Sequence, residues 1–292
     1  MSDRTGAPGA RARDPLLWWT VGPGLVYLLV FFALPLVLVA LVSVLEADPA
    51  GGVRPALSLS AYARALDPLY LSVLARSAWL ALVTTVVAVA LAYPTAWAIR
   101  AAPVRWRGPL LALVIVPSWM NLLIKNYAWI VLLRRQGIVN SALLGAGVVD
   151  APLELLFNTP AVLIGLVHTY LPFMVLPLYV ALDRMDWSLV EAATDLGAKP
   201  FSAFRQITLR LTMPGVVTGA LLVFIPMSGE YIIPNILSGG NYEFVGNVIG
   251  DQFASAQNQP FGSAMSISLM IALSGFVALY ILFATKEERF GA

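Results

Sequence analysis

The chain has 292 residues, of which 59% are hydrophobic and only 12% are charged, and its mean hydropathy is +0.81. Because a soluble domain carries about 25% charged residues, most of this chain must face lipid. A net charge of +2, scattered along the chain, gives no basis for a nucleic-acid partner, and the absence of Cys excludes disulfides, thiol nucleophiles and Cys-based metal sites.

In chain order, six apolar runs are long enough to cross a bilayer as helices, which takes about 20 residues each. They cover Gly22–Leu45, Arg76–Ile99, Leu110–Leu133, Pro160–Leu182, Gly215–Leu237 and Gly262–Thr285. Since these runs lack the strict alternation of a strand, they predict an all-α membrane protein with six transmembrane helices. The first run is too long for a signal-peptide core, so we expect it to be retained.

The basic residues predict which way the spans run, because cytoplasmic loops of membrane proteins carry an excess of Lys and Arg. Placing the N-terminus inside leaves most of the 18 basic residues in the cytoplasm, whereas the last outer loop, Ser238–Phe261, has none. We therefore expect both termini to be cytoplasmic. The expected organisation is an N-terminal segment over residues 1–21, a membrane domain over 22–285 with its core at 70–285, and a tail over 286–292.

Two polar stretches are expected on the outer side. Glu46–Tyr70 is rich in Pro, Gly and Asp and predicts a loop. In Gly137–Asn158, the apolar residues Ile138, Leu143 and Leu144 recur at roughly helical spacing, which predicts a short amphipathic helix on the outer surface.

A stretch expected in the cytoplasm, residues 183–214, carries two helix signals. Ser188 and Glu191 form an S-x-x-E capping box, which predicts a helix start, and Gly197 can end that helix in a left-handed conformation. Lys199-Pro200 predicts the start of a second helix. The apolar stripe of that helix consists of Phe201, Phe204, Ile207 and Leu211.

This loop contains the string Glu191-Ala192-Ala193-x3-Gly197-x9-Ile207-x-Leu209. The string resembles the EAA motif of bacterial ABC importer permeases, in which the loop is a coupling helix that sits in a groove on the ATP-binding subunit. The usual motif has Pro directly after the Leu, whereas this chain has Arg210 there and Pro214 four residues later. An S-x-x-E box alone is common and would make Glu191 a helix cap and nothing more, but the full spacing favours coupling. The coupling residues implied by the resemblance are Glu191, Ala192, Ala193, Asp195 and Gly197.

Similarity to one branch of that family continues along the chain, in Leu66–Tyr70, Ala92–Trp97, Val116–Trp129, Leu211–Gly215, Gly229–Gly240 and Pro260–Gly262. These stretches resemble the polyamine (spermidine/putrescine) permeases. The resemblance implies the type I ABC importer fold, a place in the bacterial inner membrane, and import of a small cationic solute. It also implies an ATPase dimer that binds ATP and Mg, a second permease that is a homologue or another copy, and an extracytoplasmic solute-binding protein. The chain itself has no G-x-x-x-x-G-K-[ST] phosphate loop, so we expect no cofactor in it and no catalysis by it.

Apart from Arg76 at the head of the second span, the expected spans contain the ionisable residues Lys125, His168 and Glu230, and a charge within a span costs about 2.5–3.5 kcal/mol. Lys125 and Glu230 are each the sixteenth residue of their span, which places them at matching depth and predicts an intramembrane ion pair. The other interpretation is that Glu230 contacts the cationic solute, because the Pro and Gly residues around it would break its span, as in helices that line a substrate path. For His168, the chain offers no second His to make a metal site, and a helix-packing hydrogen bond is favoured.

Aromatic side chains are further candidates for the substrate path. Alkyl diammonium ligands suit such rings through cation–π contacts of about 0.5–2 kcal/mol. The alternative is that the rings belt the membrane interfaces or fill helix packing. The candidates are Trp119, Tyr127, Trp129, Tyr27 and Tyr62.

Three other functions stay open from the sequence. The same fold could import another small charged solute, such as an amino-acid derivative. An ion-coupled secondary carrier would need its own coupling carboxylates, and Glu230 is the only one within an expected span. An intramembrane enzyme would need a catalytic constellation, and none can be assembled from these residues.

Overall fold

The computed structural model describes residues 15–290, and the side chains of residues 21–278. Two short strands, β1 (Leu45–Ala47) and β2 (Val53–Leu57), pair as an antiparallel hairpin. The helices in chain order are α1 (Pro15–Leu28), η1 (Leu29–Ala33), α2 (Leu34–Ser43), α3 (Ser60–Ala65), α4 (Pro68–Ala101), α5 (Val104–Ile115), η2 (Val116–Trp119), α6 (Leu122–Leu133), α7 (Ile138–Gly145), α8 (Thr159–Arg184), α9 (Ser188–Asp195), α10 (Pro200–Ala203), η3 (Phe204–Thr208), α11 (Leu209–Ser228), α12 (Ile232–Ser238), α13 (Val245–Ala254) and α14 (Gln259–Phe290).

Five of the described helices are long and apolar enough to cross a membrane, and six spans result if one bent pair counts as a single span. This confirms the predicted all-α fold with six spans. The predicted outer loop over residues 46–70 is more ordered than expected, because it contains most of the β1–β2 hairpin and helix α3. The short helix expected within residues 137–158 is present as α7.

The third span is not the continuous helix predicted over residues 110–133. Val104–Trp119 and Leu122–Gly145 are bent by 94° to each other. Pro117 lies in the 3₁₀ turn η2, where its missing N–H weakens the helical ladder. Asn121 then starts α6 anew, since its side chain accepts a backbone N–H at 2.9 Å as an N-cap.

The fifth span also breaks, as its Pro and Gly residues predicted. One helix runs from Pro200 to Ser228, and the chain then turns before α12 begins at Ile232. Residues 229–231, called the α11–α12 break below, therefore lie between two helices.

The centre of the fold is α8, which packs against α4 and α11. Two glycines on α11 allow the close crossing: a Cβ on Gly215 would lie 2.9 Å from the Pro177 carbonyl oxygen, and one on Gly219 would lie 2.6 Å from Met174 Sδ. Small residues four apart let helix backbones approach in lipid, where packing drives association. The cluster buried between α4, α8 and α11 consists of Ala88, Ala92, Ala96, Ile99, Met174, Val175, Leu178, Leu182 and Val223.

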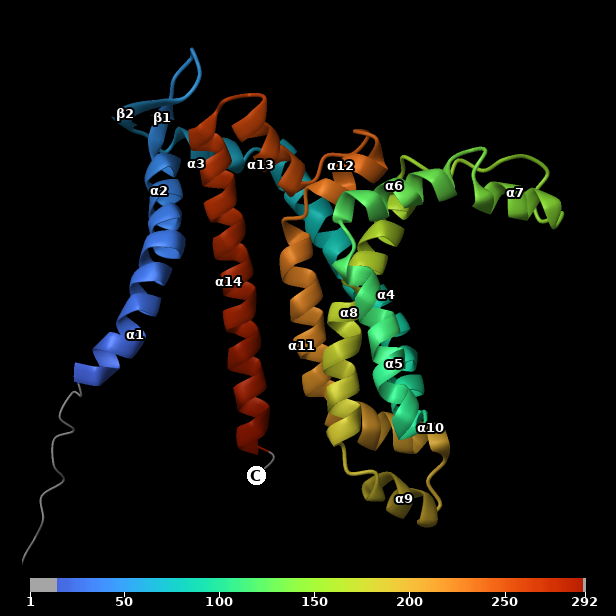
Figure 1. Cartoon of the computed structure of the whole chain (residues 1–292). Coiled ribbons are helices and arrows are strands. Elements are labelled where there is room, and N and C mark those ends of the chain that lie inside the picture. Colours follow the sequence, from blue (N-terminus) through green and yellow to red (C-terminus); the bar gives the residue numbers. More distant parts are fainter. Residues whose placement is uncertain (1–14, 291–292) are drawn as a thin grey trace, which may run out of the picture.

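The other helices are arranged around this centre (Figure 1). Helix α14 packs against α2, α3 and α13, and α12 packs against α6 and α8. Helix α7 extends to the side as an arm (Figure 1). The arm is joined to its return segment by the buried Asn140, which exchanges hydrogen bonds of 2.9 and 2.8 Å with the backbone of Leu153.

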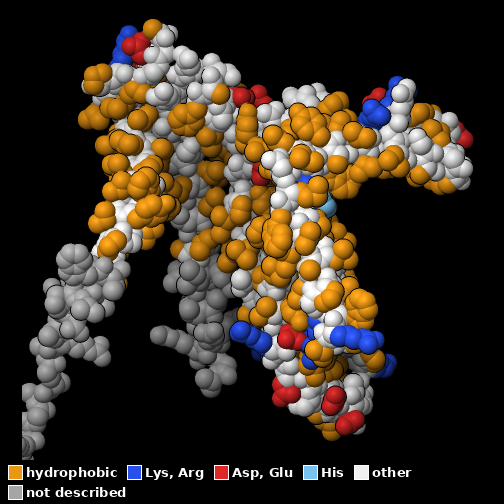
Figure 2. Space-filling view, viewed as in Figure 1, with side chains coloured by type: hydrophobic (Ala, Val, Ile, Leu, Met, Phe, Trp, Pro, Cys, Tyr) orange, Lys and Arg blue, Asp and Glu red, His pale blue; other side chains and the backbone are white. Residues whose placement is uncertain are grey.

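The start of α1, the end of α14, and helices α9 and α10 lie at one end of the molecule, the lower end in Figure 1. Figure 2 shows that most charged side chains on the visible face gather at the two ends, with a largely hydrophobic surface between them. This arrangement suits a bilayer-spanning body with aqueous regions at both ends. The cytoplasmic placement of the lower end, and of both termini, stays a prediction, and residues 1–14 and 291–292 lie outside the described residues.

Candidate functional site

The predicted coupling helix is formed and points away from the body of the protein. It is α9, which hangs below α8 in Figure 1 together with the chain that leads to α10. We call residues 185–199 the coupling segment. Of the residues predicted to couple, Ala193 is partly buried, whereas Glu191, Ala192, Asp195 and Gly197 are exposed.

Three large apolar side chains are exposed in or beside this segment. Leu189 is 47% exposed, Leu196 is 90% exposed, and Phe201, just beyond it, is 73% exposed. We call these three residues the apolar patch. Large apolar side chains that are exposed at a polar end of the molecule are typical of a surface that a partner protein covers.

The start of α9 differs from the predicted capping box. The Ser188 side chain does not cap the helix; instead the Ser188 N–H donates to Asp186 Oδ1 at 3.0 Å. The Ser188 hydroxyl and backbone N–H lower the pKa of the Asp186 carboxyl below its usual value. Asp186 thus satisfies one of the free N–H groups at the start of α9, although the N-cap residue is Trp187. The coupling role of Glu191 stays a prediction.

The end of α9 agrees with the sequence analysis. Gly197 has φ +87°, the left-handed conformation that favours glycine, and Lys199 precedes the Pro at the first position of α10. The second helix continues through η3 into α11, so one helix runs from Pro200 to Ser228 and includes the start of the fifth span, which was predicted to begin at Gly215. Arg210, where the motif usually has Pro, lies exposed within this continuous helix, which passes through Pro214 without ending.

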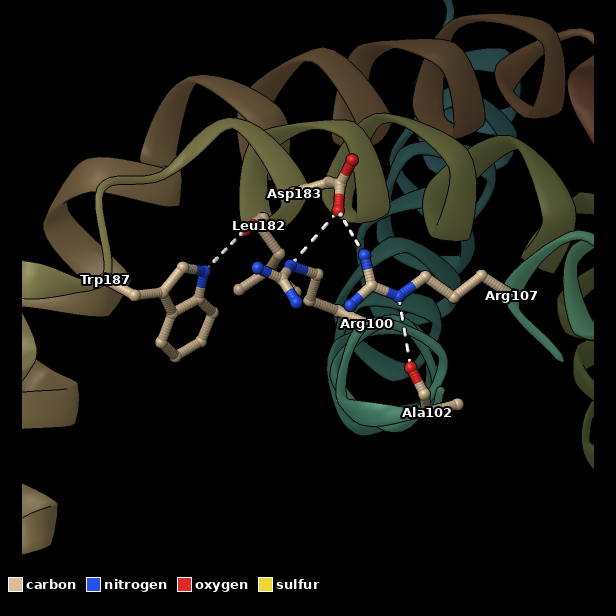
Figure 3. A network of polar contacts seen from close by, with 6 residues as sticks. All are labelled: Arg100, Ala102, Arg107, Leu182, Asp183 and Trp187. Carbon is tan, nitrogen blue, oxygen red and sulfur yellow. Dashed lines mark hydrogen bonds and ion pairs between the residues drawn. The ribbon is translucent and has the colours of Figure 1, made fainter. Parts of the chain in front are cut away.

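The base of the coupling segment is fastened to three helices by Asp183, the next-to-last residue of α8 (Figure 3). Its Oδ1 lies 3.1 Å from Arg100 Nε on α4 and accepts a hydrogen bond from Arg107 Nη1 on α5 at 3.2 Å. Arg107 Nε also donates to the Ala102 carbonyl at 3.1 Å. Asp183 therefore joins the end of α8 to the α4–α5 connection.

Aromatic side chains form a second fastening between the coupling segment and α4. Trp187 packs edge-on against Trp97 with ring centroids 5.2 Å apart, and Trp97 and Tyr93 both pack edge-on against Phe204. The Tyr93 hydroxyl shares a 2.8 Å hydrogen bond with Thr212 Oγ1 on α11. Movement of α9 would thus be passed to α4, α8 and α11 together. The sequence analysis did not single out these anchoring residues. The signals available were the basic residues Arg100 and Arg107 and the tryptophans Trp97 and Trp187.

Glu230 lies in the α11–α12 break and is partly buried. Its Oε2 accepts the Tyr170 hydroxyl at 2.6 Å, and its Oε1 accepts the Ile232 and Ile233 N–H groups at 3.1 and 3.4 Å. A carboxylate at the start of a helix is stabilised by the free N–H groups there. Tyr170 was not among the residues that the sequence singled out.

The predicted ion pair between Lys125 and Glu230 is wrong. The ion pairs among described residues join Asp48 to Arg54 and Asp183 to Arg100 and Arg107, and Lys125 is in none of them. The prediction counted depth along a straight third span, but the 94° bend lies between the counted start and Lys125. Lys125 is buried on α6, with 7% exposure.

The aromatic candidates are spread over the molecule. Trp119 is 80% exposed at the bend of the third span, and Tyr127 is 60% exposed on α6. Tyr27 is 63% exposed on α1, and the Tyr62 hydroxyl on α3 shares a 2.8 Å hydrogen bond with Ser43 Oγ. The structure thus does not gather the candidates into one site within this chain.

Trp129 has a structural partner, since its Nε1 donates to His168 Nδ1 at 3.4 Å between α6 and α8. This contact is the helix-packing hydrogen bond expected for His168. Among the described residues, no group of three or more His, Asp or Glu side chains could hold a metal ion.

Comparison with known proteins shows which family this chain matches. Residues 18–286 match the family model described as binding-protein-dependent transport system inner membrane component. The spermidine/putrescine transport system permease protein PotB of Escherichia coli K12 is 41% identical over 254 residues, covering 87% of this chain and 92% of the relative. The PotB protein of Haemophilus influenzae is 38% identical, covering 87% of this chain and 89% of the relative.

The crystal structure of a bacterial alginate ABC transporter, in complex with its alginate pentasaccharide-bound periplasmic protein, contains a chain of the same fold. The TM-score is 0.72 at 15% sequence identity, with 91% of this chain and 93% of that chain covered. A likeness at this identity supports the fold of an ABC importer permease. Together with the match over residues 18–286, it shows that the chain belongs to the family of inner membrane components of binding-protein-dependent transport systems.

Proposed function

We propose that this chain is a permease subunit of an ATP-driven importer whose solute is a polyamine, spermidine or putrescine. The observation that carries the transport role is the coupling segment, which has the apolar patch in and beside it and is fastened at its base to α4, α5 and α8. The polyamine assignment is supported by relatives at 38–41% identity that bear that name.

The proposed assembly needs three other components. An ATPase dimer binds ATP and Mg and covers the apolar patch, because the chain has no phosphate loop of its own. A second permease, homologous or identical, completes the path. A solute-binding protein delivers the solute at the end opposite to α9. This chain forms part of the solute path and moves with its coupling segment, and the partner ATPase hydrolyses ATP.

Within this assembly we assign Glu230 to the solute path. It is partly buried at a helix break within the membrane region, and a carboxylate there can accept an ammonium group. The aromatic residues Trp119 and Tyr127 are the second assignment, because their exposed rings are free to meet a solute or the second permease. Trp129, Tyr27 and Tyr62 have partners within the chain and are weaker candidates.

The experiment is solute-stimulated ATPase activity of the reconstituted complex with its binding protein, across a panel that includes putrescine, spermidine and amino-acid derivatives. We expect stimulation by a polyamine, and its loss when Glu191 and Gly197 are substituted. Stimulation by a different solute would retain the importer and refute the polyamine. Uptake that survives loss of the ATPase would instead support an ion-coupled carrier.

A charge test at Glu230 accompanies this panel. Glu230→Gln keeps the size and the hydrogen-bonding oxygen but removes the charge, so we expect polyamine uptake to fall about tenfold, the effect of losing one charge-assisted contact. Normal uptake by the variant would exclude Glu230 from the solute path.

A further inference from the structure

The carboxylate assigned to the solute path is already occupied in this structure. Both Glu230 oxygens accept hydrogen bonds: Oε1 from the first N–H groups of α12, and Oε2 from the Tyr170 hydroxyl at 2.6 Å. An ammonium group that approached Glu230 would therefore have to replace one of these donors. The backbone donors are fixed by α12, so the Tyr170 hydroxyl is the donor that can leave.

The Glu230–Tyr170 contact joins elements that are otherwise separate along the chain. Tyr170 lies on α8 and packs against both of the buried clusters that surround this helix. Glu230 lies in the α11–α12 break, which is also held from the side of α13, where Asn247 Nδ2 donates to the Tyr231 carbonyl at 3.2 Å. The contact thus fastens the α11–α12 break to the central helix.

Both fastened helices lead to the coupling segment. On α8, Asp183 lies 13 residues after Tyr170, which is about 20 Å along the helix. On the other side, one helix runs from Pro200, at the end of the coupling segment, to Ser228, next to the break. The Tyr170–Glu230 contact joins the middle of α8 to the residue two positions beyond the end of the other helix, so it constrains how the two can move relative to each other when the coupling segment moves.

We propose that Tyr170 is a positioning residue and that its hydrogen bond to Glu230 is a latch that closes the α11–α12 break in the absence of solute. An ammonium group of the solute replaces the Tyr170 hydroxyl on Oε2, which frees the α11–α12 break from this hydrogen bond while α8 stays packed against α11. This inference rests on the proposed function, since it assumes an ammonium-bearing solute and an ATPase at the coupling segment.

The exchange follows from the chemistry of the donors. A protonated amine carries three N–H donors and a full charge, so its bond to a carboxylate in a low-dielectric region is stronger than that of a neutral hydroxyl. A neutral or anionic solute would leave the carboxylate with the hydroxyl and would not open the latch. The latch therefore adds selectivity for cationic solutes. A carboxylate that was bonded only to water would not provide this selectivity.

Four variants distinguish the loss of the Tyr170–Glu230 hydrogen bond from the loss of the Glu230 charge. Tyr170→Phe removes the hydroxyl and keeps the ring that packs in the core. Glu230→Asp keeps the charge and can still accept from the start of α12, but it draws the carboxylate away from Tyr170. Glu230→Gln keeps an oxygen for the hydroxyl and loses the charge. Tyr179→Phe is the matched control, because Tyr179 is on the same helix and its hydroxyl makes no hydrogen bond with another described residue.

The measurement is ATP hydrolysis by the complete reconstituted transporter, with and without putrescine, together with the melting temperature of each variant. We expect Tyr170→Phe and Glu230→Asp each to raise solute-independent hydrolysis by about tenfold, the shift that one hydrogen bond to a charged group can produce. The double variant Tyr170→Phe/Glu230→Asp should show no further rise in solute-independent hydrolysis, because both changes break the same contact. Glu230→Gln should reduce the response to putrescine, because the charge that attracts the ammonium group is lost.

Two outcomes would contradict the latch. Solute-independent hydrolysis that stays at the wild-type level in Tyr170→Phe and Glu230→Asp overturns the latch. So does a fall in melting temperature with an unchanged ratio of stimulated to unstimulated hydrolysis, which would make the contact structural. If Tyr170→Phe does not fold, Glu230→Asp decides by itself. Failure of the proposed function would look different, since even the wild-type complex would not respond to putrescine.

Discussion

Replacement of Leu196 by Ala tests whether the apolar patch is the surface that the ATPase covers. Leu196 is 90% exposed, so the side chain makes almost no contact within the chain and its truncation should leave the stability of the permease unchanged. In the complex, the same side chain would be buried. Leu→Ala removes about three carbon groups at about 0.8 kcal/mol each, which gives a loss of about 2 kcal/mol in binding. That loss corresponds to an affinity about 30-fold lower.

The assay is the dissociation constant between the purified permease complex and its ATPase in nanodiscs, with the melting temperature measured in parallel. Leu57→Ala is the matched control, because Leu57 is 85% exposed in β2 at the opposite end of the molecule. The control should bind the ATPase with unchanged affinity. Equal affinities for the wild type and Leu196→Ala would refute the assignment of the patch, and so would equal losses in both variants.

Three further predictions concern the anchor, the core and the solute path. Asp183→Ala removes two ion pairs of about 0.5 kcal/mol each at the base of the coupling segment, so stimulated ATPase activity should fall several-fold, whereas Asp48→Ala, which breaks the Arg54 pair near the other end, should not lower it. Gly219→Val places a side chain against Met174 and should lower stability by about 1–3 kcal/mol, measured as the melting temperature, whereas Gly145→Val, where a Cβ meets nothing within 4 Å, should not. Trp119→Leu should weaken binding of labelled putrescine to the complex by about fivefold through a lost cation–π contact, and unchanged binding would remove Trp119 from the solute path.

The predictions from periodicity and composition were accurate for continuous elements. The apolar run over residues 160–182 is α8 with two residues of error at its C-terminal end, and the Gly197 turn has the left-handed φ that the motif required. The breaking of the fifth span was also predictable, because Pro and Gly act on their own neighbours along the chain. Such features depend on residues that are neighbours along the chain, so they can be predicted from the sequence.

Most predictions that depended on contacts between distant residues failed or were not made, and the helix-packing hydrogen bond of His168 is the exception. The Lys125–Glu230 pair assumed a straight third span, and the 94° bend removed the basis for its depth count. Ser188 was also predicted to cap α9, but the N-cap position is Trp187, which has no side-chain cap, and the Ser188 N–H donates to Asp186 instead.

By itself, the sequence determined that this is a helical membrane protein with a helix–Gly–helix loop that resembles the EAA motif, because hydropathy and motif spacing act over a few turns of chain. Only the tertiary structure decided what each polar group binds. Asp183 holds Arg100 and Arg107 because the ends of α4, α5 and α8 meet, and Glu230 holds Tyr170 because α8 crosses the α11–α12 break. In a membrane interior a polar group takes whichever partner the packing brings within hydrogen-bonding distance, and that distance is set by helix bends and glycine crossings.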